Sequence, residues 1–233
     1  MVEGPGATRN ARKAQGVVGF QVKTVKEAPP SSSAMWTSGL RLTAAFSLGK
    51  ELFLLFGNNE EEGRALRLHF GMNGSLRIVV SEREDWQRHT SKHNESSASF
   101  RMTLENTDVT SPVYTTKILM CHNTVVTSVS ARVARSKLDR LKNRDVCASD
   151  DLFDVSAVLS AVRKRPDAMI CDALLDQDKF PGVGNIIKIE GLFRAKVHPR
   201  RVVGSLSDSE LKRAIRACRD YAVHWLRSGR APD

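Results

Sequence analysis

The chain has few of the features that would place a protein outside the cell or in a membrane. No apolar run approaches the length of a membrane span, and the first residues lack the charged and then apolar layout of a secretion signal. The four cysteines are far apart, without any pair separated by two residues, so neither a disulfide framework nor a zinc site is indicated. We therefore expect a soluble intracellular protein with buried free thiols at Cys121, Cys147, Cys171 and Cys218.

Acidic residues are also in the minority. The 233 residues include 36 Lys and Arg against 26 Asp and Glu, which gives a formal net charge of +10. Basic residues cluster toward the C-terminal half, and this favours a polyanionic partner. The alternative is a basic, solvated surface without a specific ligand. A hydrophobic content of 41% in a chain of this length allows one large domain or two small ones with real cores.

Short strands separated by turns are the main pattern of the first part of the chain. Apolar runs and alternating residues bounded by glycine and polar turns indicate these strands, and Gly71–Gly74 reads as a loop between two of them. Several short strands joined by turns predict a β-sandwich. The expected strands are Val17–Val25, Glu51–Phe56, Ala65–Phe70, Ser75–Val80, Ala98–Leu104, Val113–Cys121 and Thr124–Val129.

The periodicity becomes helical after the strands. Ala131–Leu141 and Leu152–Val162 have helical spacing, and a last helix begins with a capping box formed by Ser207 and Glu210. We predict an α+β protein, with a β-sandwich domain at residues 1–147, a helical domain at residues 148–233 and a ligand cleft between them.

A glycine-containing turn, Pro181–Gly184, separates two further short helices. Pro181 cannot continue a helix, and the glycines let the backbone approach a ligand closely. Free N–H groups at the start of the next helix, near Asn185, would bind a phosphate, and Lys188 adds a full charge one turn later. An ordinary turn of a helical hairpin is the alternative.

The first residues read most simply as a flexible Gly/Pro leader. A chemical interpretation begins with the small Val2, which allows removal of Met1 and leaves a free α-amine. Such an amine titrates near ~8, so an appreciable fraction is an uncharged nucleophile at neutral pH. Glu3 would lie within reach as an acid or base.

Four motifs in this order resemble the Fpg/Nei (formamidopyrimidine-DNA glycosylase/endonuclease VIII) family. Val2, where most of that family has proline, and the phrase Phe180–Lys188 resemble its third Nei-like branch in vertebrates. The resemblance covers about residues 1–225 and is weak between Ala7 and Leu40. The motifs are Met1–Gly6, Leu48–Lys50, His69–Arg77, and Asp176–Gln177 followed by Gly184–Lys188.

The resemblance implies base excision by a bifunctional DNA glycosylase/AP lyase. In the family the N-terminal amine, here on Val2, attacks C1′ of the damaged nucleoside and forms a Schiff base. Glu3 corresponds to the general acid/base, and Lys50 to the essential lysine that holds a phosphate beside the lesion. Without the other motifs, Lys50 would be read as a surface lysine before a strand.

DNA-binding roles are also implied by the resemblance. Met72 matches the residue that fills the gap left by an extruded nucleotide, although an apolar core residue is the alternative. Asn185, after Gly184 and before Lys188, matches the asparagine that binds flanking phosphates, and it could also act as a helix N-cap. His69 supports this loop or a phosphate, or is a strand histidine with satisfied hydrogen bonds.

The resemblance has one clear departure. The family's C-terminal β-hairpin zinc finger, whose arginine clamps the lesion phosphate, has no counterpart, so we expect no metal and no cofactor. The helical part corresponds to the family's helix-two-turn-helix. The resemblance further implies a monomer in the nucleus that acts on damaged DNA and favours single strands. The alternatives are a non-catalytic or weakened DNA-binding remnant that uses the helix-two-turn-helix, and a phosphate-binding structural domain.

Overall fold

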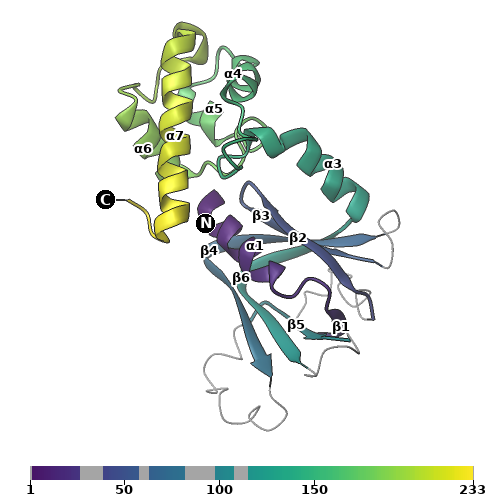
Figure 1. Ribbon diagram of the computed structural model, residues 1–233. Helices are drawn as coiled ribbons and strands as arrows, with labels where there is room; N and C mark the ends of the chain where they lie inside the picture. The colour runs from purple at the N-terminus through teal and green to yellow at the C-terminus, as the bar shows by residue number, and fades with distance from the viewer. Residues whose placement is uncertain (1, 27–38, 58–62, 82–97, 108–114, 233) are drawn as a thin grey trace. The chain divides into compact units, whose positions relative to one another are not determined.

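The computed structural model describes residues 2–26, 39–57, 63–81, 98–107 and 115–232. The strands are β1 (Gln21–Lys26), β2 (Leu42–Leu48), β3 (Glu51–Phe56), β4 (Arg64–Ser81), β5 (Phe100–Glu105) and β6 (Thr116–Ser130). The helices are α1 (Gly4–Gln15), α3 (Ala131–Leu141), α4 (Val155–Arg163), α5 (Ile170–Leu175), α6 (Asn185–Arg194) and α7 (Asp208–Ser228), with short 3₁₀ turns at Lys142–Arg144 and Val203–Ser205 (Figure 1). The predicted α+β class is confirmed.

Two compact units make up the chain. The first contains Asn10–Ser47 and Glu51–Ser136, and the second contains Val2–Arg9, Leu48–Lys50 and Lys137–Asp233. Two short segments from the N-terminal part of the sequence therefore belong to the helical unit. The predicted domain limits at residues 147 and 148, and the cleft between the domains, stay predictions.

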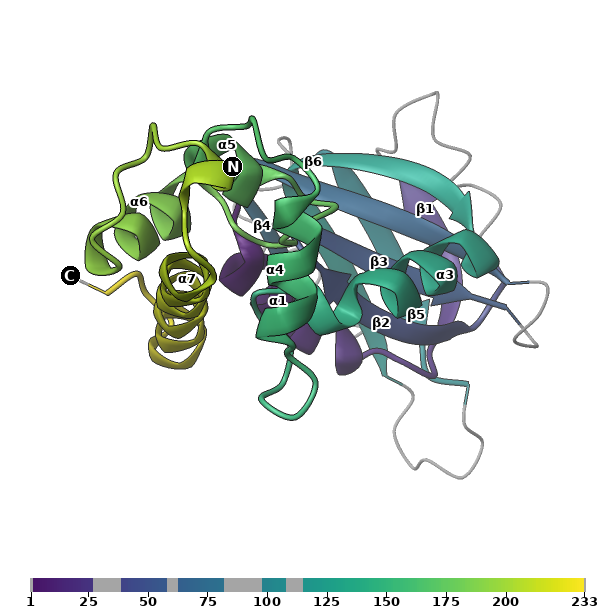
Figure 2. The same ribbon diagram turned by 90° about the horizontal axis from the view of Figure 1, so that it is seen from above.

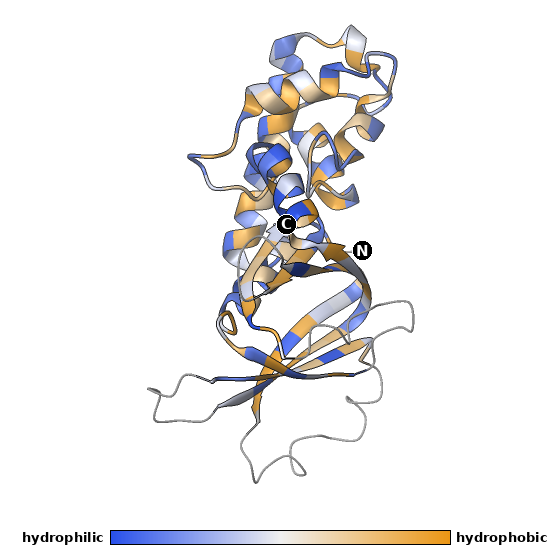
Figure 3. Ribbon diagram, turned by 90° about the vertical axis from the view of Figure 1, so that its right-hand side faces the viewer, coloured by the Kyte–Doolittle hydropathy of each residue, from blue (hydrophilic) through white to orange (hydrophobic). Residues whose placement is uncertain are grey.

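One six-stranded sheet forms the first unit, in the order β1-β5-β6-β4-β3-β2. The pairings of β1 with β5, β5 with β6, β6 with β4 and β4 with β3 are antiparallel. The sheet is strongly curved, and apolar and polar residues follow one another along its strands (Figure 3). The predicted β-sandwich thus takes the form of a single curled sheet.

Strands β4 and β6 are each longer than predicted. In β4 the predicted loop Gly71–Gly74 is an irregularity within one strand, where the register with β6 shifts between Phe70 and Ser75. Asn73 and, on β6, Asn123 take left-handed φ angles of 58° and 47° at this place. An irregularity of this kind accommodates extra residues without ending the pairing, so the expected separate strands are joined. The start of the predicted strand Val113–Cys121 lies outside the described residues.

The core of the first unit includes one element that the sequence predicted, strand β3, and one that it did not, helix α1. Strand β3, predicted with its observed limits, is buried along Leu52–Phe56. Helix α1 was not predicted, because Gly4, Pro5 and Gly6 resemble a leader. Pro5 is tolerated in the first turn, where its missing N–H would have no partner within the helix. Ala11 and Ala14 then bury the same face of the helix.

Strand assignments near the start of the sheet needed the most correction. Strand β2 (Leu42–Leu48) was not predicted, and β1 is confined to Gln21–Lys26, whereas Val17–Val25 was expected. The C-terminal part of α1 is held to the sheet by Lys13 Nζ, which donates to Leu76 O at 3.3 Å, and by the side chain of Gln15, which donates to Ala45 O.

The helices of the second unit pack around one apolar core. Figure 2 shows α7 end-on, with α6 beside it. Their contact depends on Gly191, because a Cβ at this position would lie 2.2 Å from Cys218 Sγ. Helix α4 begins three residues later than predicted, because the Asp154 side chain caps it by accepting from the N–H groups of Ser156 and Ala157. None of the described helices is long and apolar enough to cross a membrane.

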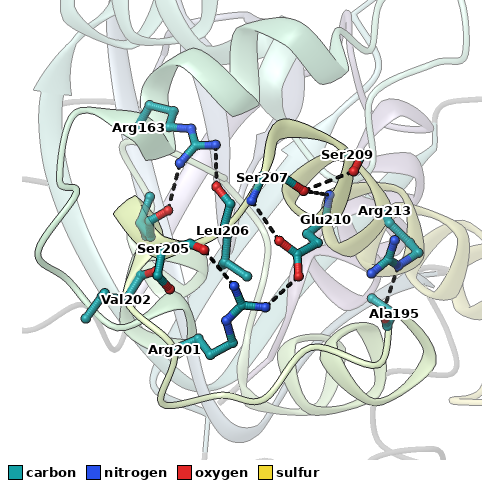
Figure 4. Close-up of polar contacts among 11 residues, drawn as sticks. Arg163, Ala195, Arg201, Val202, Ser205, Leu206, Ser207, Ser209, Glu210 and Arg213 are labelled. Carbon is teal, nitrogen blue, oxygen red and sulfur yellow. Dashed lines mark hydrogen bonds and ion pairs between the residues drawn. The ribbon is translucent and has the colours of Figure 1, made fainter.

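Helix α7 begins at the predicted capping box. Ser207 Oγ accepts from Glu210 N at 3.2 Å, and Glu210 Oε2 accepts from Ser207 N at 2.7 Å (Figure 4). The same carboxylate receives a hydrogen bond from Arg201 Nη1 at 2.5 Å. Arg163 donates to Val203 O and Leu206 O at 2.7 Å each, so two arginines organise the segment before α7.

Candidate active site

The carboxylate of Glu3 caps helix α6. Its Oε1 accepts from Ile186 N at 2.8 Å, and its Oε2 accepts from Ile187 N at 3.1 Å. The side chain is only 5% exposed. The first turn of a helix has N–H groups without partners inside the helix and a partial positive charge, so an anionic carboxylate is stabilised there.

Gly184 makes this cap possible. A Cβ at Gly184 would lie 2.3 Å from Cδ of Glu3, so a larger residue would expel the carboxylate. Gly184 itself is the N-cap residue and has no side chain to offer. Asn185 is therefore the first residue of the helix, as predicted, and the alternative that it acts as the N-cap is wrong. The free N–H groups expected to bind phosphate are also partly taken, because Glu3 occupies those of Ile186 and Ile187.

A backbone junction brings the N-terminal segment to the turn Pro181–Gly184. Gly4 N donates to Gly182 O at 2.9 Å. Gly182 has a left-handed φ of 89°, and its own N–H donates to Gln177 Oε1 at 3.0 Å. The amide group of Gln177 donates in turn to Val183 O at 2.9 Å. The Gln177 side chain therefore stabilises the turn through hydrogen bonds to its backbone.

Lys50 follows a tight turn at the same junction. Gly49 has a left-handed φ of 61°, and a Cβ there would lie 3.1 Å from Gly182 N. Lys50 is half-buried, and its pKa is lowered by desolvation, while the negative charge of Glu3 opposes this shift. The two predicted catalytic side chains are thus electrostatically coupled.

Val2 is half-buried and directly precedes Glu3. Its side chain packs closely over Gly6, because a Cβ at Gly6 would lie 2.4 Å from Val2 Cγ1. The start of α1 at Gly4 excludes the flexible leader considered for the described part of this segment. Val2, Glu3 and Lys50 all belong to the helical unit.

Asn185 and Lys188 form an exposed pair at the start of α6. Lys188 Nζ donates to Asn185 Oδ1 at 2.7 Å. The Asn185 amide nitrogen and the remaining hydrogens of the ammonium group can still donate to an anion. The sequence correctly placed these residues at a helix start, although the neighbouring Glu3 was not expected there.

The other two predicted DNA-binding residues lie on β4 in the first unit. Met72 is 76% exposed, which excludes the alternative of an apolar core residue. Its carbonyl accepts from Asn123 Nδ2 at 3.4 Å. His69 is half-buried and pairs with Glu51 of β3 in the strand register. Its role stays a prediction.

Sequence reasoning missed the buried charges behind the site. Asp145 is 6% exposed, and its Oδ2 accepts from Gly49 N at 2.6 Å. Arg219 is 7% exposed and donates to Val146 O at 2.6 Å and to Asp150 Oδ1 at 2.9 Å. The sequence offered a weak signal for Asp145 alone, because it stands at the predicted domain boundary.

The described residues contain no cluster of three or more His, Cys, Asp or Glu side chains that could hold a metal ion. All four cysteines are free. Cys121 and Cys218 are buried as predicted, whereas Cys147 and Cys171 are partly exposed.

Comparison with known proteins identifies the family. Residues 147–227 match the formamidopyrimidine-DNA glycosylase H2TH domain. The chain is 32% identical over 263 aligned positions to endonuclease 8-like 3 of Mus musculus, covering 99% of this chain. The chain belongs to the Fpg/Nei family. This Fpg/Nei chain spans 39% of the length of the mouse protein. It is also 27% identical to the formamidopyrimidine-DNA glycosylase of Mycobacterium avium, over 87% of this chain and 65% of that protein.

Solved structures of DNA glycosylases share the fold of this Fpg/Nei chain. A viral DNA glycosylase superimposes with a TM-score of 0.73 at 19% identity, covering 100% of this chain and 86% of the other. The Fpg of Lactococcus lactis, solved in complex with DNA that contains N7-benzyl-Fapy-dG, gives a TM-score of 0.71 at 18% identity, with coverage of 98% and 80%.

Proposed function

We propose that the protein is a bifunctional DNA glycosylase/AP lyase of base excision repair. The observation that carries the proposal is the buried Glu3 carboxyl group, which the start of α6 holds directly beside Val2 and within the electrostatic influence of Lys50. Membership of the Fpg/Nei family supports a role in DNA repair. The substrate in this proposal is DNA with an oxidised base, and no metal or cofactor takes part.

The proposed reaction begins after removal of Met1. The uncharged Val2 amine attacks C1′ of the damaged nucleotide, the glycosidic bond breaks, and the departing base takes a proton from water. The Glu3 carboxylate accepts the proton that the attached nitrogen loses and passes it to the ring oxygen O4′, so that the sugar opens and the nitrogen becomes an imine. The imine acidifies the C2′ hydrogen. Loss of this proton then expels the 3′ phosphate by β-elimination and nicks the strand.

Charge in the site supports this sequence of steps. Glu3 accepts two backbone N–H groups, which keep its carboxyl group in one orientation. In the proposal, the Lys50 ammonium group binds the phosphate beside the lesion and balances the negative charge that approaches Glu3. The cost of burying Lys50 is partly offset by that same carboxylate.

The surrounding residues are proposed to hold DNA. Asn185 and Lys188 would bind phosphates next to the lesion, and Gly184 would contribute indirectly, by leaving the space that Glu3 occupies. The exposed Met72 would fill the space that the extruded nucleotide leaves, because its flexible apolar side chain stacks without hydrogen-bond demands. His69 would support the same strand. We further propose a preference for single-stranded or abasic DNA, a nuclear location and a monomeric state.

The proposal is tested with oligonucleotides that carry one oxidised pyrimidine, in single-stranded and duplex form. We expect release of the base and a nick, faster on the single strand, and loss of both in a Glu3→Gln variant. DNA binding without release or nicking by the wild-type protein would contradict catalysis and select the alternative of a non-catalytic DNA-binding protein. Absence of salt-dependent DNA binding would reject both.

A further inference from the structure

A buried carboxylate that has no part in the proposed reaction lies behind the site. Asp145 belongs to the helical unit and stands between the 3₁₀ turn Lys142–Arg144 and helix α4. Its Oδ2 accepts from Gly49 N at 2.6 Å, and its Oδ1 accepts from Cys147 N at 2.7 Å. Both carboxylate oxygens are therefore occupied by backbone donors. Such charge-assisted bonds are among the stronger hydrogen bonds in proteins.

Asp145 joins segments that are remote in the sequence. Gly49, which it binds, lies 96 residues earlier and directly precedes Lys50. The next residue, Val146, donates its N–H to Pro181 O at 2.9 Å, at the start of the turn that leads to α6. One short segment thus determines where the Lys50 turn lies relative to the turn before α6.

The packing around this segment leaves little space for adjustment. A Cβ at Gly182 would lie 2.7 Å from Val146 Cγ1 and 3.5 Å from Asp145 Oδ1. A Cβ at Gly49 would lie 3.1 Å from Gly182 N. Because the backbones touch here, a change in the Asp145 bond to Gly49 cannot be absorbed locally. We expect the change to move Lys50, the next residue.

A carboxylate is chemically required at this place. Asparagine has almost the same shape, but it offers one acceptor oxygen and an NH₂ group, which would face an N–H donor. Either Gly49 or Cys147 would then lose its hydrogen bond in a buried position. The structure thus makes an ionised side chain at residue 145 a condition for the observed turn.

We propose that Asp145 is a positioning residue for Lys50. Its carboxylate holds the Gly49 N–H, and thereby fixes the place from which the Lys50 ammonium group interacts with Glu3. The inference rests on the proposed function, in which Lys50 binds the phosphate beside the lesion. Asp145 itself touches no reacting atom in this account.

The positioning depends on pH. Burial raises the pKa of Asp145 to about 6, although the N–H groups of Gly49 and Cys147 and the charge of Arg219 on α7 favour the ionised form. Among the described residues, Arg219 also pairs with Asp150 at 2.9 Å, and Cys147 carries a free thiol in the same segment as Asp145. Lys50 in the adjoining turn and Glu3 before α1 are further ionisable groups of this junction. Protonation turns one oxygen into a donor, so one backbone N–H loses its acceptor. In this proposal Lys50 loses part of its support as the pH falls below about 6, the pKa of Asp145.

The test compares the wild-type chain, without Met1, with the variants Asp145→Asn and Gly49→Ala. The first readout is the rate of borohydride trapping on single-stranded DNA with one abasic site, between pH 5 and pH 8. We expect a fall of about ten- to hundredfold in both variants, since small misplacements of a reacting group are costly. Below pH 6, the slope of log rate against pH should be smaller by about one for Asp145→Asn than for the wild type, because the variant has one titrating group fewer.

The second readout needs no DNA. Acetic anhydride labels unprotonated lysine side chains, and mass spectrometry measures the labelling of Lys50 as a function of pH. The wild-type Lys50 should react at lower pH than ordinary lysines, and Asp145→Asn should move this profile. Asp139→Asn is the matched control, because Asp139 is exposed and pairs only with Lys142, at 2.8 Å, among the described contacts.

The outcomes separate the two claims. A folded Asp145→Asn variant with the wild-type trapping rate, pH slope and Lys50 labelling would overturn the positioning role, while the proposed function would stand. A wild-type protein that does not trap DNA would overturn the proposed function, and Lys50 labelling would still decide the positioning role. If Asp145→Asn does not fold, Gly49→Ala retains the carboxylate and strains the turn, so an unchanged rate in that variant would overturn the inference.

Discussion

Glu3 combines a structural role with a proposed chemical one, and substitutions can separate the two. The carboxylate accepts the N–H groups of Ile186 and Ile187, and the bond to Ile187 is buried while that to Ile186 is partly buried. An unsatisfied buried donor costs about 1–3 kcal/mol, so both oxygens contribute to the fold of the helical unit. The acid/base role, in contrast, needs an ionisable group.

We predict that Glu3→Ala lowers the free energy of unfolding by about 2–4 kcal/mol, because it leaves two donors unpaired and a small cavity. Glu3→Gln keeps one acceptor and the side-chain volume, so it should lose about 1 kcal/mol while abolishing base release. Urea denaturation measures the first effect. Glu190→Gln on α6 is the control, because Glu190 is half-buried and its described ion pair, with Arg194 at 3.5 Å, lies in the second half of the helix. Equal stability of Glu3→Ala and wild type would show that Glu3 does not cap α6.

At the scale of secondary-structure elements, helix α6 depends on a cap from a distant segment. Its own N-cap residue is Gly184, and the capping side chain belongs to Glu3, which lies 183 residues before Ile186 in the chain. A residue with a Cβ at position 184 would remove that side chain from its place. The φ angle of Gly184 is −111°, so backbone strain does not contribute and the effect is purely steric.

For Gly184→Ala we predict a loss of about 1–3 kcal/mol in stability and loss of trapping on abasic DNA, because the new methyl group would lie 2.3 Å from Glu3 Cδ. Thermal unfolding and a trapping assay measure the two effects. Gly16→Ala is the matched control, since its Cβ would meet the nearest atom at 3.4 Å. A stable, active Gly184→Ala protein would show that Glu3 does not occupy this space.

Helix α7 provides a prediction on pH. Hydrogen bonds from Ser207 and Arg201 lower the pKa of Glu210 from 4.5 to about 2. A depressed pKa stabilises the fold above the unfolded value, and this contribution is lost as the pH falls from about 4.5 toward 2. The melting temperature of Glu210→Gln should therefore approach that of the wild type over this interval. A constant difference between the two proteins would contradict the capping box.

At the scale of the whole molecule, the net charge of +10 predicts DNA binding that weakens with salt. On single-stranded DNA, each lysine that contacts a phosphate contributes about 0.7 to the slope of log K against log salt. We expect Lys188→Ala to reduce the magnitude of this slope by about that amount, as measured by fluorescence anisotropy. Lys142→Ala, whose side chain pairs with Asp139 outside the proposed site, should leave the slope nearly unchanged. Equal slopes for both variants would show that Lys188 does not contact a DNA phosphate.

The sequence predicted features that depend on neighbouring residues and missed those that depend on distant ones. The limits of β3 and α3, and the capping box of α7, follow from local patterns and are confirmed. The capping of α6 by Glu3 and the bond from Asp145 to Gly49 join residues far apart in the chain, so no local pattern reveals them. Helix α1 was missed because Gly4 and Gly6, which allow close packing at its start, are also typical of a flexible leader.

The central claim is that the Val2 amine becomes covalently bound to DNA. The most direct measurement is borohydride trapping of the chain, with loss of Met1 confirmed by mass, on single-stranded DNA with one abasic site, followed by mapping of the crosslinked peptide. We predict a crosslink at Val2 that disappears when the α-amine is blocked by acetylation. A crosslink at another residue, or DNA binding without any crosslink, would contradict the account.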